Sequence, residues 1–238
     1  MNAKRGYVPE DDRNFSPAAL EKLRTASRHV KYLIDEGYDL KQASTFAGNH
    51  FQLSERQRLA VVRSLATEEQ LKNRGKKERQ APAGGEVWID GFNTVITLEV
   101  LLSGSPLFDC MDGTVRDLAA LRGTYRLIPE TAEAVRLLLD VRREGGVRSA
   151  HVLLDEPVSN SGRLKALIAD AGAGYPFDTD IRILKEVDRA LYGKECVVTS
   201  DSVILDHCAS WVNLTAPCVK KRGGHTLRVW GKEKNGET

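Results

Sequence analysis

The feature that most constrains the fold is a regular alternation of short apolar segments and helical patterns between residues 86 and 215. The apolar segments lie at residues 87–89, 150–154, 180–184, 195–199 and 210–214. The helical patterns lie at residues 94–102, 131–144, 159–171, 187–192 and 203–209. Strands that alternate with helices predict a parallel sheet with right-handed crossovers. We therefore predict an α/β fold with a Rossmann-like parallel sheet of strand order 3-2-1-4-5.

A helical segment precedes the alternating part of the chain. Ser16 followed by Pro17 has the pattern of a helix start, and Ser54 with Gln57 has that of a capping box. These patterns predict a small all-helical N-terminal domain over residues 1–66. Changes in composition then predict a charged linker at 67–85, the α/β domain at 86–220 and a basic C-terminal tail at 221–238.

Composition and simple motifs exclude several classes of function. The net charge is only +2, so the chain as a whole is not a general binder of polyanions. Its four cysteines form no Cys-x-x-Cys pair, which argues against a zinc site, and no Gly-x-Gly-x-x-Gly motif or phosphate-loop lysine favours a nucleotide fold. No apolar run approaches the roughly 20 residues of a membrane helix. Because residues 1–10 also lack the apolar core of a signal peptide, we expect a cytoplasmic protein without membrane association.

Aspartates stand where three of the predicted strands end. Asp90 follows the first strand, Asp155 the second and Asp201 the fourth, while Asp188 opens the short helix before the fourth strand. In the predicted order the first and fourth strands are neighbours, so Asp90 should lie beside Asp201, with Asp155 one strand away. Clustered carboxylates repel one another, and Mg²⁺ or Mn²⁺ removes that cost. Each aspartate alone is also a common helix N-cap, which remains the alternative at every position.

Three motifs carry a resemblance to a known family. They are Asp90-Gly91-Phe92-Asn93, Lys185-Glu186-Val187-Asp188 and Thr199-Ser200-Asp201. In this order they resemble the motifs of the PIN-like superfamily, in particular its NYN branch, over about residues 86–215. Members of that superfamily are metal-dependent nucleases that mostly act on RNA. The resemblance implies metal ligands at Asp90, Asp188 and Asp201. The helical front end resembles a prokaryotic domain of unknown function that precedes such domains.

The resemblance also implies supporting residues around the metal. Asn93 would orient Asp90 or a substrate phosphate, and Ser200 belongs to the third motif. The family often has one more acid after that motif, for which Asp206 is available. Another family acid follows the first helix, and Asp112 and Asp117 are the candidates for it, while Asp155 is a further supporting residue. Because residues 104–128 follow no clear pattern, the sequence does not predict how the first two of these are placed.

Basic and hydroxyl residues are the predicted contacts to the RNA backbone. They are Arg56 and Arg58 in the helical domain, Lys76 and Lys77 in the linker, and Ser159, Asn160 and Ser161 at a predicted helix start. Lysine and arginine neutralise phosphates, and helix N-termini present free N–H groups to them. A solvated helix surface and a plain capped turn are the alternatives for these residues.

We therefore expect a Mg²⁺- or Mn²⁺-dependent endoribonuclease that hydrolyses RNA phosphodiester bonds through an aspartate cluster. One alternative is a non-catalytic RNA-binding or adaptor protein on a PIN-like fold, and a less favoured one is a metal-dependent small-molecule phosphatase. Three carboxylate oxygens within reach of one cation would favour the nuclease, whereas a site closed by lysine or arginine would favour the adaptor. The expected partner is RNA, and formation of a homodimer is left open.

Overall fold

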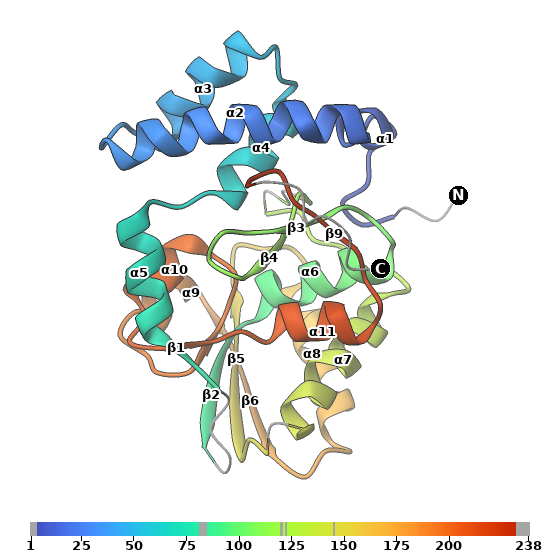
Figure 1. Cartoon of the computed structure of the whole chain (residues 1–238). Helices are drawn as coiled ribbons and strands as arrows, with labels where there is room; N and C mark the ends of the chain where they lie inside the picture. Colours follow the sequence, from blue (N-terminus) through green and yellow to red (C-terminus); the bar gives the residue numbers. More distant parts are fainter. Residues whose placement is uncertain (1–3, 81–84, 120, 122, 145, 232–238) are drawn as a thin grey trace.

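The computed structural model describes residues 4–80, 85–119, 121, 123–144 and 146–231. Within these residues a six-stranded parallel sheet forms the centre of the α/β part (Figure 1). Its strands are β1 (Glu78–Arg79), β2 (Glu86–Asp90), β5 (Ser149–Asp155), β6 (Asp178–Leu184), β7 (Val197–Val198) and β8 (Trp211–Val212). Their spatial order is β1-β8-β7-β2-β5-β6. The five predicted strands thus have the predicted order 3-2-1-4-5, and β1 adds a sixth strand beside β8.

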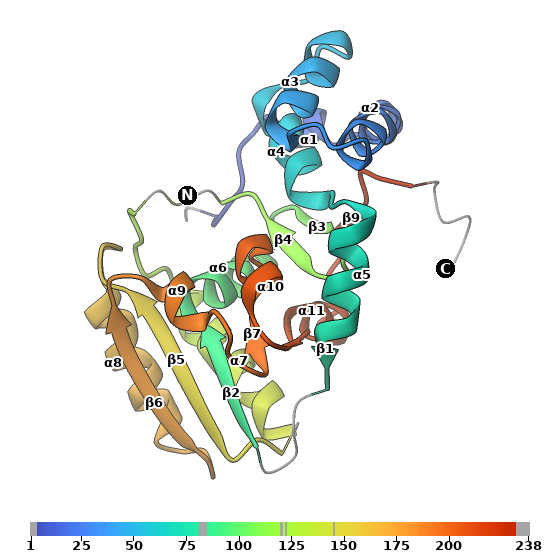
Figure 2. The same ribbon diagram turned by 90° about the vertical axis from the view of Figure 1, so that its left-hand side faces the viewer.

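Helices cover both faces of this sheet, as Figure 2 shows. On one face lie α6 (Gly91–Leu102), α7 (Thr131–Glu144) and α8 (Ser161–Gly172), with α11 (Thr215–Lys221) beside them. Their apolar side chains, such as Leu98, Leu138 and Ile168, form one core cluster with Ile89 and Val152 of the sheet. The short helices α9 (Val187–Leu191) and α10 (Ser202–His207) cover the other face. No helix in the described ranges is long and apolar enough to cross a membrane.

A second, three-stranded sheet occupies the segment that the sequence left without a pattern. It consists of β4 (Val115–Asp117), β3 (Leu107–Asp109) and β9 (Thr226–Leu227), in that order. In Figure 1 it lies between the main sheet and the N-terminal helices. These helices are α1 (Asp11–Asn14), α2 (Pro17–Asp35), α3 (Leu40–His50) and α4 (Glu55–Ser64), which we call the helical unit. Phe108, Leu118 and Val229 share one apolar cluster with this unit, so its core continues onto the small sheet.

The segment predicted to be a charged linker is mostly ordered structure. Residues 68–77 form α5 (Glu68–Lys77), which begins at a capping box between Thr67 and Gln70, and residues 78–79 form β1. The side chain of Arg74 is only 2% exposed. The prediction of a linker is therefore wrong for residues 68–79, because α5 packs against α10 and β1 pairs with β8. Residues 81–84 of the predicted linker lie outside the described residues.

The predicted basic tail also contributes to the fold. Residues 226–227 pair with β3 in parallel, and Val229 is fully buried. The tail prediction therefore fails for residues 221–231, since the chain there returns to complete the small sheet. Residues 232–238 of the predicted tail lie outside the described residues.

A buried carboxylate on α6 joins distant segments of the chain. Glu99 is 0% exposed and accepts hydrogen bonds from Arg5 Nε at 2.8 Å, from the Tyr125 hydroxyl at 2.7 Å and from the Thr131 hydroxyl. The pairing satisfies the buried charge, because each carboxylate oxygen has a donor. Glu99 thus fixes the N-terminal segment and the segment before α7 to one face of α6.

Replacing Glu99 with alanine should lower the free energy of unfolding by about 3–5 kcal/mol, because Arg5 would then be a buried charge without its partner. Urea unfolding followed by circular dichroism measures the change. The matched control is Glu133→Ala on α7, whose half-exposed carboxylate lies 3.0 Å from Arg222 and should contribute less than about 1 kcal/mol. Equal changes in the two variants would contradict the structural role of Glu99.

Candidate functional site

The strand that carries Asp90 ends at a close contact between α6 and β5. A Cβ atom at Gly91 would lie 2.6 Å from Leu154 Cδ2 and 2.8 Å from the backbone oxygen of Leu153. Only glycine permits this approach without a shift of the neighbouring strand. The contact sets Asp90 at the carboxyl end of β2, where ligands bind in open α/β sheets.

Four aspartates act on one another at this edge of the sheet, as the strand order predicts. Asp90 is 6% exposed, and its pKa is raised to about 8, mainly by burial. A hydrogen bond from the Thr199 hydroxyl opposes this shift, whereas the carboxylates of Asp201, Asp155 and Asp188 add to it. Burial also raises the pKa of Asp155 and of Asp188, with Asp188 adding to the first and Asp201 to the second. We call these four residues the acid cluster.

Asp201 acts as a helix N-cap, which is the alternative role considered for each aspartate. Its Oδ1 accepts hydrogen bonds from the backbone N–H groups of Val203 at 2.8 Å and Ile204 at 3.2 Å, at the start of α10. Asp90 stands at the same position before α6 but makes no side-chain capping bond. Helix capping therefore uses one carboxylate oxygen of Asp201. It does not explain why the Asp90 side chain is buried.

The turn at residues 199–201 is held against the start of α6 by side-chain hydrogen bonds. Asn93 Oδ1 accepts from both the backbone N–H and the hydroxyl of Ser200, each at 2.9 Å. Thr199 Oγ1 donates to Asp90 at 2.8 Å and accepts from the backbone N–H of Asp201 at 3.0 Å. Asn93 therefore orients the turn rather than Asp90 itself. No role was predicted for Thr199, although it lies within the third motif.

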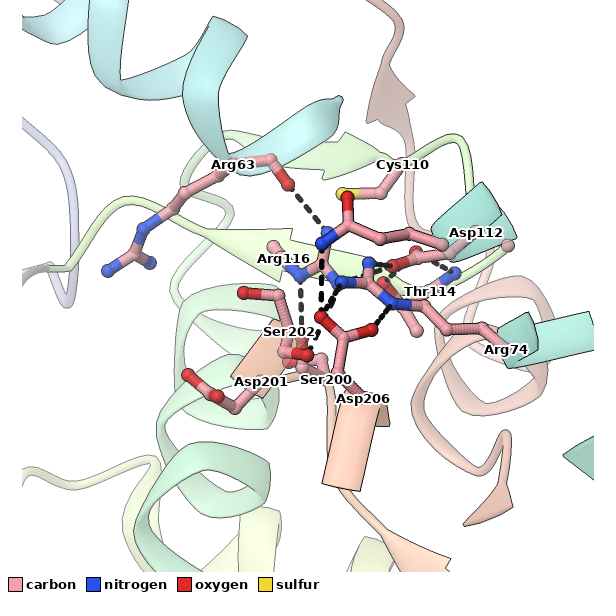
Figure 3. A network of polar contacts seen from close by, with 12 residues as sticks. Arg63, Arg74, Cys110, Asp112, Thr114, Arg116, Ser200, Asp201, Ser202 and Asp206 are labelled. Carbon is pink, nitrogen blue, oxygen red and sulfur yellow. Dashed lines mark hydrogen bonds and ion pairs between the residues drawn. The ribbon is translucent and has the colours of Figure 1, made fainter. Parts of the chain in front are cut away.

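A buried ion-pair network holds the same turn from the other side (Figure 3). Arg116 donates to the backbone oxygen of Ser200 at 2.5 Å, to that of Arg63 at 2.6 Å and to Asp112 at 2.6 Å. Arg74 donates to Asp112 at 2.7 Å. Burial tends to raise the pKa of Asp112, but Arg116 and its other partners outweigh burial and lower it. Arg116 thus connects the helical unit to the residue that precedes Asp201.

The remaining predicted acids do not join the acid cluster. Asp112 is taken up by the arginine network just described, and Asp206 accepts two hydrogen bonds from Arg74, at 2.7 and 2.8 Å. Asp117 accepts from the Thr97 hydroxyl at 2.7 Å. These three carboxylates stabilise the packing of α5, the small sheet and α6. Asp155 is the supporting acid that does lie within electrostatic reach of Asp90.

The predicted basic RNA contacts are mostly engaged within the protein. Arg56 forms a bidentate pair with Asp11, at 2.9 and 2.8 Å, and Arg58 donates to the end of α3 and the loop after it. Lys77 donates to two backbone oxygens of α10, at 3.2 and 2.7 Å. Lys76 is exposed on α5. The first three residues therefore stabilise the fold, and only Lys76 presents its charge to solvent.

The predicted phosphate contacts at the start of α8 have a different role as well. The hydroxyl of Ser159 contacts the backbone of Tyr125, donating to its oxygen and accepting from its N–H, both at 2.9 Å. Asn160 donates to the same oxygen at 2.7 Å. These two side chains hold the segment before α7 in place. Ser161, which begins α8, is half-buried.

Two properties of this region bear on its chemistry. Among the described residues, no group of three or more histidines, cysteines, aspartates and glutamates is arranged to hold a metal ion. These residues therefore do not form a site with three or more such side chains around one cation. A cavity of 230 Å³ opens beside Asp201, and Asn93, Arg63, Arg74 and Arg116 are among the residues that line it.

Comparison with known proteins gives matches along most of the chain. A family model described as "Domain of unknown function (DUF5616)" matches residues 79–217, and one described as "Protein of unknown function (DUF434)" matches residues 22–77. "Uncharacterized protein MJ0935" of Methanocaldococcus jannaschii is 32% identical over 185 residues, which cover 77% of this chain and 88% of that protein. No solved structure matches the chain. None of these descriptions names an activity.

Proposed function

The chain belongs to the DUF5616 family, and from the chemistry of its acid cluster we propose that it is a Mg²⁺- or Mn²⁺-dependent ribonuclease of the PIN/NYN type. The observation that carries the proposal is the convergence of four aspartates at the carboxyl edge of the sheet, where burial and the other three carboxylates raise the pKa of Asp90. Like charges at a buried position are costly unless a cation binds there. We propose a cytoplasmic location for this activity.

The donor set of the acid cluster suits a hard divalent cation. All four side chains offer carboxylate oxygens, which Mg²⁺ and Mn²⁺ prefer over nitrogen or sulfur ligands. Mg²⁺ keeps several waters and is usually bound through one or two carboxylates together with substrate phosphates. A site with fewer than three protein ligands is therefore compatible with this ion. In the proposal Asp90 and Asp201 hold the cation, and Asp188 stands on the exposed rim.

The proposed roles of the side chains follow from their contacts. A divalent cation bound there would supply an activated water and charge stabilisation at the phosphoryl oxygens. Thr199 and Asn93 fix the turn that carries Asp201, which limits the movement of the ligands. Asp188 has an exposed carboxylate at the edge of the acid cluster, where it can accept a proton from a bound water.

The test is incubation of the purified protein with an RNA mixture and with single-stranded DNA, in Mn²⁺ or in chelator. We expect RNA to be shortened in Mn²⁺ and to stay intact in chelator, with DNA cut more slowly. RNA that stays intact in Mn²⁺ and in Mg²⁺ would overturn the proposal.

One observation favours the second function, a non-catalytic RNA-binding protein. The cavity beside Asp201 is lined by Arg63, Arg74 and Arg116, and arginines next to the carboxylates reduce the need for a cation. Under this alternative, RNA would bind equally well with and without Mn²⁺ and would remain uncut. The same incubation, followed by a gel-shift measurement, separates the two functions.

A further inference from the structure

The cavity beside Asp201 lies between the helical unit and the acid cluster. Val62 and Arg63, at the end of α4, line one side of it. Asn93, Asp201 and Ser202, at the starts of α6 and α10, line another. The cavity therefore begins at the proposed catalytic edge and extends to a wall that only the helical unit supplies. A molecule held at the acid cluster would contact both parts of the chain.

The arginines that line the cavity differ in what they can still bind. Arg74 and Arg116 use all their guanidinium nitrogens for carboxylates and backbone oxygens of the network in Figure 3. Arg63 donates from Nη1 to the Asp117 backbone oxygen at 2.5 Å, and the same nitrogen lies 3.6 Å from the Asp117 carboxylate. The Arg63 side chain is 33% exposed. Within the described residues, its Nε and Nη2 donate to no acceptor. Figure 3 shows its guanidinium group pointing away from the network. Arg63 is thus the arginine with donors left for a ligand.

Size and lining indicate the kind of ligand. Pockets that enclose a whole small molecule usually have roughly 300–1,000 Å³, so a cavity of 230 Å³ suits one part of a longer substrate. Leu40, Val62 and Leu65 give it an apolar side. Its polar side includes Arg63, the Ser202 hydroxyl and the carboxylates of Asp117 and Asp201. Flat apolar groups and a charged phosphate alternate in this way along a single nucleic-acid strand, where bases pack on apolar side chains and arginine binds phosphate.

We propose that this cavity binds one nucleotide of a single-stranded RNA, next to the phosphodiester at the acid cluster, with Arg63 donating to its phosphate. This inference rests on the proposed function for its substrate class. It gives the helical unit a direct part in substrate binding, and it gives a physical reason for residues 22–77 and 79–217 to occur in one chain.

The experiment measures binding of a fluorescein-labelled single-stranded RNA decamer by anisotropy, in chelator so that the RNA stays intact. Arg63→Gln removes the charge and keeps a donor for the Asp117 oxygen. We expect it to weaken binding ~10- to 100-fold, which is the effect of one charge-assisted contact. The slope of log Kd against log salt should also fall by about 0.7, the value for one phosphate contact on a single strand. A merely structural role of Arg63 would not change this slope.

Two further variants complete the test. Arg136→Gln removes an equal charge from an exposed position on α7, and we expect wild-type affinity and an unchanged salt slope. Val62→Trp fills the cavity without changing charge, and we expect it to weaken binding as well. Thermal unfolding by circular dichroism checks that each variant is folded. An affinity within about twofold of wild type in either Arg63→Gln or Val62→Trp would overturn the inference.

The outcomes also separate this inference from the proposed function. If the wild-type protein cuts RNA in Mn²⁺ but Arg63→Gln binds RNA normally, the inference fails and the ribonuclease remains. If the protein never cuts RNA but Arg63→Gln and Val62→Trp both weaken binding, the cavity is an RNA site and the ribonuclease proposal fails.

Discussion

Asp201→Asn is expected to abolish Mn²⁺-dependent cleavage of RNA, with a rate at least roughly 1,000-fold below that of the wild type. A metal ion at a phosphoryl centre supplies several kcal/mol of transition-state stabilisation, and ~4 kcal/mol corresponds to about that factor. Asparagine keeps the Oδ1 atom that accepts hydrogen bonds from Val203 and Ile204, and it is as good an N-cap as aspartate. The variant should therefore fold normally, so that loss of cleavage reports on the carboxylate alone.

The matched control for this prediction is Asp170→Asn, which removes one exposed carboxylate from α8 and should leave the cleavage rate unchanged. Asp90→Asn should lose cleavage to a similar extent, because its side chain is the most buried member of the acid cluster. Cleavage rates are measured under single-turnover conditions on one labelled RNA. Wild-type rates in both Asp90→Asn and Asp201→Asn would show that the acid cluster is not the catalytic centre.

The free energy of unfolding is expected to fall as the pH rises, because Asp90 loses its proton. Its pKa is about 8 in the folded protein, against 3.8 for a free aspartate, so the folded state holds the proton more tightly than the unfolded state does. The protonated carboxyl group of Asp90 therefore stabilises the folded state. This stabilisation is complete when the pH is below the pKa of the unfolded chain, and it is lost as the pH rises towards 8. Between pH 5 and pH 9 the loss should be on the order of 4 kcal/mol.

Asp90→Asn isolates this contribution, because asparagine stays neutral and still accepts the hydrogen bond from Thr199. Urea unfolding in chelator at pH 5, 7 and 9 gives the free energy of unfolding for both proteins. We expect the variant to become increasingly more stable than the wild type as the pH rises. Addition of Mn²⁺ at pH 9 should recover part of the loss in the wild type only. Parallel pH profiles would contradict the buried, charge-crowded environment of Asp90.

The part of the fold that sequence patterns predict best is the part built from long local signals. β2, β5 and β6 are short apolar runs between clear helices, and right-handed crossovers then leave few possible strand orders. Because the order places the first and fourth strands side by side, the electrostatic contact of Asp90 with Asp201 could be predicted from the sequence. The topology rule alone predicts that Asp90 and Asp201 lie close together, and no knowledge of side-chain packing is needed.

The small sheet could not be predicted, because its strands depend on partners far away in the chain. β3 has three residues and pairs with β9 more than 100 positions later, while Phe108 packs on the helical unit. Strands of two or three residues carry too few positions for an alternating pattern. The same segment supplies Arg116 and Asp112, so the sequence could not reveal that this part of the site is an arginine network rather than another metal ligand.

The burial and the ion-pair partners of charged side chains could not be predicted for a related reason. A lysine or arginine in a charge-dense stretch usually lies in solvent, and composition alone cannot show a buried partner. Arg74 is buried because Asp112 and Asp206 meet it from two other elements, and Arg56 is engaged by Asp11 and a distant backbone oxygen. The place of Arg63 in the cavity could not be predicted from the sequence, because it depends on how α4 meets the turn at residues 199–201.

The location of the cation tests the central claim most directly. Crystals of the protein with a non-cleavable RNA oligonucleotide and Mn²⁺ can be measured with X-rays at the manganese absorption edge, so that the ion is identified by its anomalous signal. We expect one anomalous peak between the carboxylates of Asp90 and Asp201, with a phosphate of the RNA beside it. No anomalous peak at the acid cluster, with RNA bound elsewhere on the protein, would contradict the proposed metal-dependent ribonuclease.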